Sequence, residues 1–381
     1  MKPRLYPQSG LSLIELMIAM GLGLLLVAAL GYLYVGQRQS WRMVEAVARL
    51  QENGRFALEL LGQDLRMAGY AGCLSTAEAR PQLLAKLDDP AKKSPFESLL
   101  NPFLQNGWLA RGYGPGVAGT SSGWGVDRNL DGSVNATDRP EDHLANTDSL
   151  LVVGGSNPVI TLGAGAMGST ESVISAAGND RAFRQGELAL IGDCERADVF
   201  RVSDDSAGYG SASSPIEHTN PLPHRDRRNT SNALSKAYGA GAQLMPLNLS
   251  VYYLRTNPAG RPALYRLPWA RDSVGPGEAG WGTSEELIEG VEGMRIVYGE
   301  DTNNDGAVDF YRIASAVSNW SRVRAVRVSL LLVSPEDGVA PSAQTYVWDT
   351  DNDGELDDTV TAADRRLRMV FTSTYALRNR P

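Results

Sequence analysis

The sequence has few of the residues that zinc and thiol chemistry require. It contains three histidines and two cysteines among 381 residues, whereas zinc sites are built mostly from several of these side chains. Positive charge is also in the minority, with 36 lysines and arginines against 44 acidic residues and a formal net charge of −8. The few histidines and cysteines argue against zinc enzymes and thiol enzymes. Because phosphate binding needs a basic surface, the negative net charge argues against nucleic-acid-binding proteins.

The remaining composition predicts a folded protein with many turns. Hydrophobic residues make up 43% of the chain and charged residues 21%, which is enough to bury a core and excludes a disordered tail. The 40 glycines and 20 prolines favour many turns and long loops. The length suits one large domain or two ordinary ones.

A long apolar run lies close to the start of the chain. Residues 16–35 contain no charged side chain, and as a helix they would extend ~30 Å, enough to cross a bilayer core. A short basic segment with Lys2 and Arg4 precedes the run and ends at Gly10. An ordinary signal peptide has its small cleavage-site residues after the apolar run, a place where Ala28 and Ala29 offer only a weak site.

The residues around Gly10 carry a more specific signal. The segment reads Gly10-Leu11-Ser12-Leu13-Ile14-Glu15 and resembles the class III signal of type IV prepilins. The resemblance implies cleavage after Gly10 by a prepilin peptidase of the inner membrane, and N-methylation of the new terminus at Leu11. Removal of Lys2 and Arg4 would change the net charge to −10.

Glu15 is the acidic residue at the edge of the apolar run. A carboxylate in the hydrocarbon region is costly unless it is paired, and such residues usually have a function. In an assembled fibre Glu15 could pair with the α-amino group of a neighbouring subunit. The alternative is a glutamate at the interface edge of a plain membrane anchor.

The helical pattern continues beyond the apolar run. Apolar residues recur at steps of three and four along residues 44–68, interrupted at Gln51 and Gly54, so we expect one helix from about Leu11 to about Met67, ~85 Å long. We therefore divide the chain into a leader (1–10), a transmembrane half of the helix (11–35), an amphipathic half (36–68) and a β-rich periplasmic head (69–381).

Segments at both ends of the chain resemble the PilW family of minor pilins, which belong to type IV pilus machines. They are residues 51–57 and 64–73, and then 289–294, 298–299, 320–332 and 371–380. The resemblance implies an α+β pilin-like fold, in which a long N-terminal helix packs on an antiparallel β-sheet head with long loops. It also implies a structural role. The absence of any nucleophile–base arrangement in the sequence counts against an enzyme, and no catalytic residue is predicted. The partners that it implies are the inner membrane, the major pilin, PilV- and PilX-type minor pilins and a large tip adhesin.

After Cys73 the pattern changes to short apolar runs separated by polar loops. We expect strands at residues 150–153, 159–162, 187–191, 199–202, 249–254, 263–267, 294–298, 308–313, 323–333, 345–348 and 367–374, and a turn or two of helix at 285–291. Cys73 follows the long helix and Cys194 follows a strand. In an oxidising compartment they would form a disulfide between helix and sheet; two buried free thiols are the alternative.

Three acidic loops have the form Asp-x-(Asp/Asn)-x-Asp-Gly, in which alternate oxygens converge as they do in EF-hand and related calcium loops. The first loop offers Asp127, Asn129, Asp131, Ser133, Asn135 and Asp138. The second offers Asp301, Asn303, Asp305, Ala307 and Asp309. The third offers Asp349, Asp351, Asp353, Glu355 and Asp357. Calcium ions are therefore the predicted cofactor, and plain hairpin turns are the alternative.

The leading hypothesis is a minor pilin that inserts in the inner membrane, is processed, and joins other minor pilins in a complex that primes or caps the pilus. The last segment also resembles component J, a minor pseudopilin of type II secretion, and this is the second hypothesis. A third, of another class, is a membrane-anchored calcium-dependent binding protein or hydrolase.

Overall fold

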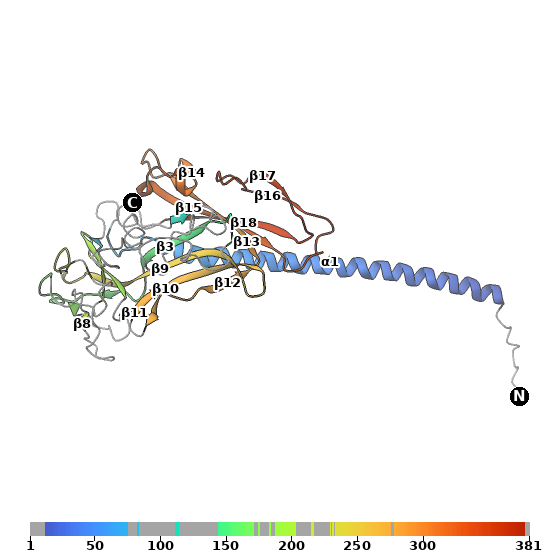
Figure 1. Cartoon of the computed structure of the whole chain (residues 1–381), viewed down its shortest axis with the longest axis horizontal. Helices are drawn as coiled ribbons and strands as arrows, with labels where there is room; N and C mark the ends of the chain where they lie inside the picture. The colour runs from blue at the N-terminus through green and yellow to red at the C-terminus, as the bar shows by residue number, and fades with distance from the viewer. Residues whose placement is uncertain are drawn as a thin grey trace, which may run out of the picture.

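The protein consists of one long helix and a β-rich head (Figure 1). The structure, a computed structural model, describes residues 12–74, 82–83, 111–113, 144–170, 174–175, 183, 187–202, 215–216, 229, 231, 233–275 and 278–377. The N-terminal part of the helix projects away from the head, and its C-terminal part lies along it.

Helix α1 (Leu13–Met67) begins at a capping box. The Ser12 hydroxyl accepts a hydrogen bond from the Ile14 backbone N–H at 3.2 Å, and the Glu15 carboxylate accepts one from the Ser12 N–H at 3.0 Å. These bonds satisfy two of the donors that a helix start leaves open. The helix contains no proline and continues as a single element into the head, as the sequence predicts.

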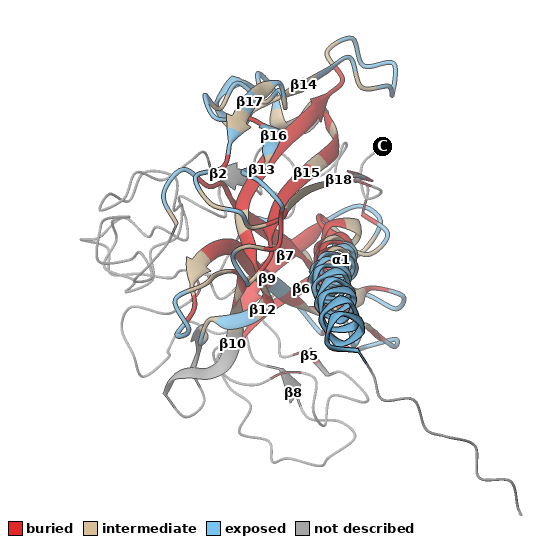
Figure 2. Cartoon of the chain, turned by 90° about the vertical axis from the view of Figure 1, so that its right-hand side faces the viewer, coloured by how far each residue is buried: buried red, intermediate tan, exposed pale blue. Residues whose placement is uncertain are grey.

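The buried side of α1 begins only at Ala46, and Figure 2 shows the preceding part exposed. The buried residues of the helix are Ala46, Leu50, Gly54, Ala57, Leu61, Gly62 and Leu65. The expected stripe is thus partly wrong, because Val44 is exposed and Gly54 lies within the buried line rather than interrupting it. Gly54 is buried because the Phe371 ring occupies the space that a side chain would fill.

A ten-stranded sheet forms the larger layer of the head, and its pairings are antiparallel except for the parallel β1–β7 pair. Its central strands are β9 (Gln243–Thr256) and β10 (Pro262–Gly275). The others are β1 (Gln82–Leu83), β2 (Arg111–Tyr113), β3 (Ser149–Gly155), β4 (Ile160–Thr161), β6 (Leu188–Gly192), β7 (Ala197–Arg201), β11 (Glu278–Trp281) and β12 (Glu285–Glu289). Strands β6, β3 and β4 pair with β9, and β11 and β12 pair with β10.

A four-stranded antiparallel sheet in the order β14–β13–β15–β18 forms the second layer. Its strands are β13 (Val291–Glu300), β14 (Phe310–Arg312), β15 (Val323–Val333) and β18 (Arg368–Ala376). Two two-stranded sheets complete the described strands. One is the hairpin of β16 (Thr345–Trp348) with β17 (Asp358–Thr361), and the other pairs β5 (Ile174–Ser175) with β8 (Pro215–Ile216). Two short 3₁₀ helices, Ala314–Ala316 and Trp320–Arg322, lie between β14 and β15.

Strand β18 provides much of the surface on which α1 rests. The Tyr375 hydroxyl donates a hydrogen bond to the Leu58 carbonyl of the helix at 2.5 Å, and the Tyr375 ring lies against Gly62. The Tyr252 hydroxyl of β9 donates to the Asp64 carboxylate at 2.6 Å. One hydrophobic core contains the buried face of α1 and strands of both sheets, so the helix is an integral part of the head from Ala46 onward.

The prediction of helix at residues 285–291 is wrong. These residues form β12 and the start of β13, joined by a turn at Gly290, where φ is +86°. The run Glu-Glu-Leu-Ile-Glu favours helix locally. In the structure it pairs with β10 instead, and this pairing buries Ile288. Local propensity does not reflect the hydrogen bonds that a distant strand supplies. Strands β9 and β10 are also longer than expected, whereas β15 and β16 have the predicted bounds.

Candidate functional site: the exposed spine and the acidic loops

We call helix α1 the spine, and its first part is an exposed apolar surface. Helix α1 is the one described helix that is long and apolar enough to cross a membrane, and none of its most apolar window is buried. Large aliphatic side chains project all around this segment, among them Leu22, Leu24 and Leu25 at 58–69% exposure. A helix that is apolar on every side requires an apolar environment, which a bilayer or a bundle of similar helices provides.

Glu15 lies in the first turn of this surface, where its carboxylate caps the helix. The cleavage-site residues Gly10 and Leu11 lie outside the described residues. The helix dipole places partial positive charge at this end and favours an acidic group there. The capping contact therefore positions Glu15 beside the point where processing would create the new terminus.

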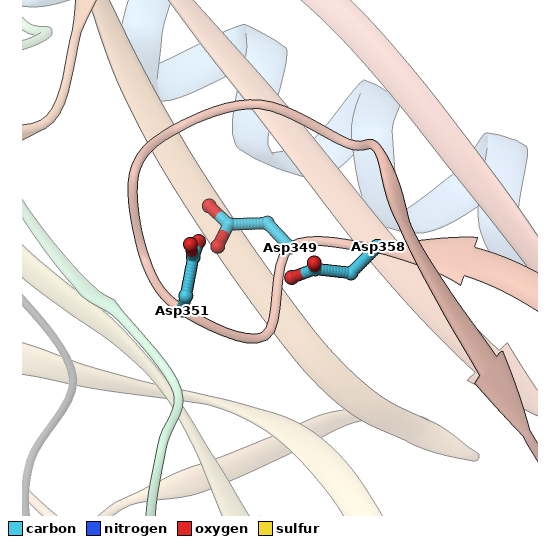
Figure 3. Close-up of side chains that lie close together, drawn as sticks. All are labelled: Asp349, Asp351 and Asp358. Carbon is cyan, nitrogen blue, oxygen red and sulfur yellow. The ribbon is translucent and has the colours of Figure 1, made fainter.

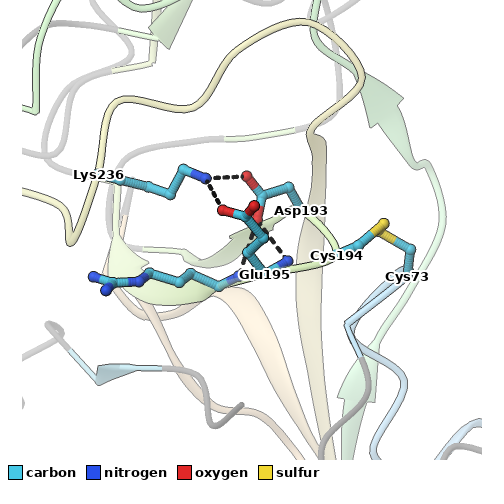
Figure 4. The surroundings of a disulfide bond; sticks show 6 residues. Cys73, Asp193, Cys194, Glu195 and Lys236 are labelled. Atoms are coloured by element: carbon cyan, nitrogen blue, oxygen red, sulfur yellow. Dashed lines mark hydrogen bonds and ion pairs between the residues drawn. A yellow bond between two sulfur atoms is a disulfide. The ribbon is translucent and has the colours of Figure 1, made fainter. Parts of the chain in front are cut away.

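Cys73 and Cys194 form the expected disulfide (Figure 4). Their Cα atoms lie 4.8 Å apart, and the bond joins the end of the spine to the β6–β7 turn across 121 residues of sequence. The turn is held independently by Asp193, whose carboxylate accepts the backbone N–H groups of Glu195 and Arg196. Lys236 forms ion pairs with Asp193 and Glu195, one on each side of Cys194.

Two of the three acidic loops lie within the described residues, and both connect the strands of a hairpin. The second loop joins β13 to β14, and the third joins β16 to β17. They follow the same backbone path, with positive φ at Asn304 and Gly306 in one and at Asn352 and Gly354 in the other. Loop one, from Asp127 to Asp138, lies outside the described residues.

The carboxylates of the second loop are compensated by hydrogen bonds within the loop and by an arginine of β15. The Asp301 carboxylate accepts the N–H groups of Asn304 and Gly306 and binds Arg324 Nε at 3.1 Å. Burial works to raise the pKa of Asp301, but these hydrogen bonds and the guanidinium more than offset it and hold the pKa below its usual value. The Asn303 amide donates to Asp305 at 3.1 Å and to Asp309 at 3.4 Å, and so lies between their carboxylates.

The third loop leaves a cluster of like charge. Oxygens of Asp349, Asp351 and Asp358 lie within 4.8 Å of one another, and Figure 3 shows the three carboxylates gathered inside the loop. Asp351 takes the place that Asn303 has in the second loop, so a carboxylate replaces the bridging amide. Three carboxylates at this separation repel one another, and six to eight hard oxygens are the environment that Ca²⁺ prefers.

The third loop closes on a residue that the sequence pattern does not select. Asp358, the first residue of β17, accepts hydrogen bonds from the Thr350 N–H and hydroxyl, the same role that Asp309 has toward Thr302. Asp357 is exposed and lies outside the cluster, as do Asp353 and Glu355. The hairpin register, Trp348 opposite Asp358, determines which aspartate turns inward.

A buried ionic group lies behind the third loop. Arg295 of β13 donates from Nε to the Asp349 carbonyl at 3.1 Å and lies 3.6 Å from the Asp349 carboxylate. Asp148 accepts the Ile296 N–H at 2.8 Å. Burial raises the pKa of Asp148 to about 7 despite the nearby Arg295, and burial also raises the pKa of Asp349. The loop is thus joined to the centre of the head through Arg295.

Two family models match this chain, one at its N-terminal end and one in its C-terminal third. A family model described as the prokaryotic N-terminal methylation motif matches residues 6–31. A second, described as Type IV Pilus-assembly protein W, matches residues 251–379, which include the last six residues of β9 and all strands from β10 to β18. A search of curated proteins and a search of solved structures found no match.

A methylation motif, an exposed apolar spine and an antiparallel head define a membrane-anchored pilin that assembles with other pilus components. The match to the assembly-protein model then gives the family, and the chain is a PilW-type minor pilin of the type IV pilus. Pilins and PilW proteins are structural assembly components.

Proposed function

We propose that this minor pilin joins other minor pilins in a complex that primes pilus assembly and remains at or near the tip of the fibre. Before assembly the head stands in the periplasm, and afterwards it is displayed at the cell surface. The protein acts through assembly and not through catalysis. PilV- and PilX-type minor pilins, the major pilin and a large tip adhesin are the proposed partners, and prepilin peptidase is the processing enzyme.

The observation that carries this proposal is the uncovered spine. Its apolar residues from Leu13 onward are exposed over several helical turns before the first buried residue, Ala46. In the membrane, lipid covers this surface. In a fibre, other spines must cover it, since an exposed apolar surface of this size is unfavourable in water.

The size of the head favours the end of the fibre. A ten-stranded sheet and a four-stranded sheet form a head against one face of the second half of a single helix. Between stacked subunits, a wide head must fit the spacing that neighbouring spines impose. At the tip it meets neighbours on one side only.

The test is to tag the head and to locate the tag on sheared fibres by immunogold labelling in a strain that lacks the chromosomal copy. The expected result is loss of most pili on deletion, recovery on complementation, and gold particles at one end of each fibre. Labels along the whole shaft would contradict the tip position. Normal piliation with loss of protein secretion would instead support a component J-like pseudopilin.

We further propose that Glu15 pairs with the α-amino group of a neighbouring subunit and sets the register of the spine. Glu15→Gln retains a hydrogen-bond acceptor for the Ser12 N–H but removes the charge. The variant is expected to be processed and to remain in the membrane without entering fibres, whereas Glu45→Gln, exposed further along the helix, enters normally. Equal incorporation of both variants would rule out the register role.

We also propose that the third loop binds one Ca²⁺ through Asp349, Asp351 and Asp358. What supports this is the like-charge cluster, which the amide of Asn303 and the guanidinium of Arg324 relieve in the second loop. Loop one retains its own proposed ligands, Asp127, Asn129, Asp131, Ser133, Asn135 and Asp138, as a separate proposal.

The calcium proposal is tested by the shift in unfolding temperature of the full chain on adding Ca²⁺ after chelation. Asp351→Asn copies the second loop and should reduce the shift, whereas Asp305→Asn, in the second loop, should leave it unchanged. An Asp351→Asn variant that responds like the wild type would show that the third loop holds no calcium.

A further inference from the structure

A short exposed segment of α1 separates the apolar run from the head, and we call residues 36–45 the neck. The apolar run ends at Val35, and the first buried residue of the helix is Ala46. The neck therefore extends ~15 Å along the helix axis. The polar headgroup layer on one side of a bilayer is about 5–8 Å thick, so the neck is long enough to pass through it.

Three side chains of the neck share one face of the helix. Arg38, Trp41 and Arg42 are spaced three and four residues apart, the spacing that places side chains side by side on a helix. Trp41 is 67% exposed although it is one of the largest apolar side chains of the protein. Tryptophan with its amphipathic ring is enriched at the boundary between hydrocarbon and headgroups.

Two basic residues, Arg38 and Arg42, precede the one acidic residue of the neck, Glu45. No acidic residue occurs between Glu15 and Glu45, so both arginines lie in a stretch without a carboxylate. Among the residues that the structure describes, neither Arg38 nor Arg42 has an ion-pair partner, whereas Arg49, about two turns beyond Arg42, pairs with Glu45 at 2.6 Å.

Arg42 also lines a groove between the helix and the head. The opposite wall is the segment that follows β15, with Pro335 and Glu336. Glu45 in the groove is paired with Arg49, which leaves the Glu336 carboxylate as the competitor for Arg42. The groove lies where the spine enters the head, because Ala46, the first buried residue of α1, is also part of its lining.

We propose that the neck binds the phosphate groups of anionic phospholipids in the membrane that the spine crosses. Arg38 and Arg42 bind the phosphate oxygens, and Trp41, which lies between them along the helix, places its amphipathic ring at the same headgroup level. A guanidinium offers several N–H donors in a planar arrangement that fits phosphate. Along a helix perpendicular to the bilayer, Arg38 and Arg42 lie about 5 and 10 Å beyond the end of the apolar run, which is the depth of the headgroups.

This arrangement fixes how deeply the spine sits before assembly, and extraction into a fibre has to release the bound headgroups. The proposal rests on the membrane anchor and not on the tip position. If only the lipid-binding proposal is wrong, tagged heads still label the fibre ends. If only the tip position is wrong, the neck still retains lipid.

The test uses the full chain in nonionic detergent and measures retained phospholipid by native mass spectrometry. The probes are phosphatidylglycerol, phosphatidylcholine and inorganic phosphate. Each arginine near an anionic surface contributes about fivefold in affinity, so Arg38→Gln with Arg42→Gln should reduce phosphatidylglycerol retention on the order of 25-fold. Glu336→Gln should raise it, because the competing carboxylate is gone.

Arg55→Gln is the matched control, since Arg55 is an exposed arginine of the same helix at the level of the head. It is expected to retain lipid like the wild type. Unchanged retention in the double variant would overturn the proposal, as would an equal loss in the Arg55 variant. Displacement of the lipid by millimolar inorganic phosphate, or equal retention of phosphatidylcholine, would show that the site does not select anionic headgroups.

Discussion

The contact between the Tyr375 ring and the spine provides a direct test of how the head holds its helix. Gly62 has no side chain, and a Cβ built there would lie 2.5 Å from Cε1 of Tyr375, well inside van der Waals contact. The Tyr375 hydroxyl reaches the Leu58 carbonyl one turn earlier. Gly62→Ala must therefore displace the ring, and it weakens this hydrogen bond as well.

The expected loss follows from three opposing effects. Overpacking a well-packed site costs about 1–3 kcal/mol, and the loss of one hydrogen bond costs about 1 kcal/mol. Alanine in place of glycine inside a helix returns about 1 kcal/mol. The net expectation is a decrease of about 2 kcal/mol in the free energy of unfolding of the head.

The assay is urea unfolding of the full chain in detergent, followed by near-ultraviolet circular dichroism. Gly36→Ala is the control, because a Cβ at Gly36 meets no atom within 4 Å, and it should cause no loss. Tyr375→Phe retains the ring but removes the hydroxyl, so it isolates the hydrogen bond at about 1 kcal/mol. If Gly62→Ala is as stable as Gly36→Ala, the ring does not lie against the helix and the packing argument fails.

Three further predictions concern the disulfide, a buried carboxyl and the hairpin loops. Changing Cys73 and Cys194 together to serine should lower the free energy of unfolding by about 5 kcal/mol in the chain-entropy model, and added reductant should then have no effect on the urea midpoint. Because burial raises the pKa of Asp148 to about 7, its folded state binds a proton that the unfolded state releases; stability should therefore fall as pH rises from about 4 to about 7. Asp148→Asn should flatten that part of the profile in urea unfolding at a series of pH values, and an unchanged slope would exclude Asp148 as its source. Gly306→Ala should cost about 1–2 kcal/mol through its positive φ, and Gly354→Ala should cost more, since a Cβ there meets Val297 at 3.0 Å; equal costs in thermal unfolding would contradict this crowding.

The spine could be predicted from the sequence because its signals are local and continuous. The apolar run, the missing proline and the recurring small and apolar residues all lie within one segment. The buried stripe was less accurate. Its position depends on Phe371 and Tyr375, which lie more than 300 residues later in the chain. Their rings contact the helix at Gly54 and Gly62, where a large apolar side chain would not fit.

Strand bounds were also predicted best where the signal is local. Residues 323–333 form a continuous run rich in valine and leucine that is bounded by polar turns, and β15 has the predicted limits. Residues 285–291 contain a helix-like sequence that forms a strand because β10 supplies its hydrogen-bond partners. A local pattern contains no information about which distant edge is available for pairing.

The acidic loops show most clearly what a motif can and cannot determine. The motif gave the turn: Asn and Gly take the positive φ values at corresponding positions in both loops. It did not give the electrostatics, because Arg324 and Arg295 come from other strands and meet their loops differently. Arg324 binds the Asp301 carboxylate at 3.1 Å, whereas Arg295 donates to the Asp349 backbone carbonyl and stands 3.6 Å from the Asp349 carboxylate.

The register of a hairpin completes this difference. Pairing of Trp348 with Asp358 brings Asp358 into the third loop and leaves Asp357 outside. Two loops with nearly the same motif therefore differ in their need for a cation: one carries an amide and a guanidinium among its carboxylates, and the other carries a third carboxylate. Exchanging the single side chain at the third position, Asn303→Asp against Asp351→Asn, should accordingly transfer the calcium response from one hairpin toward the other.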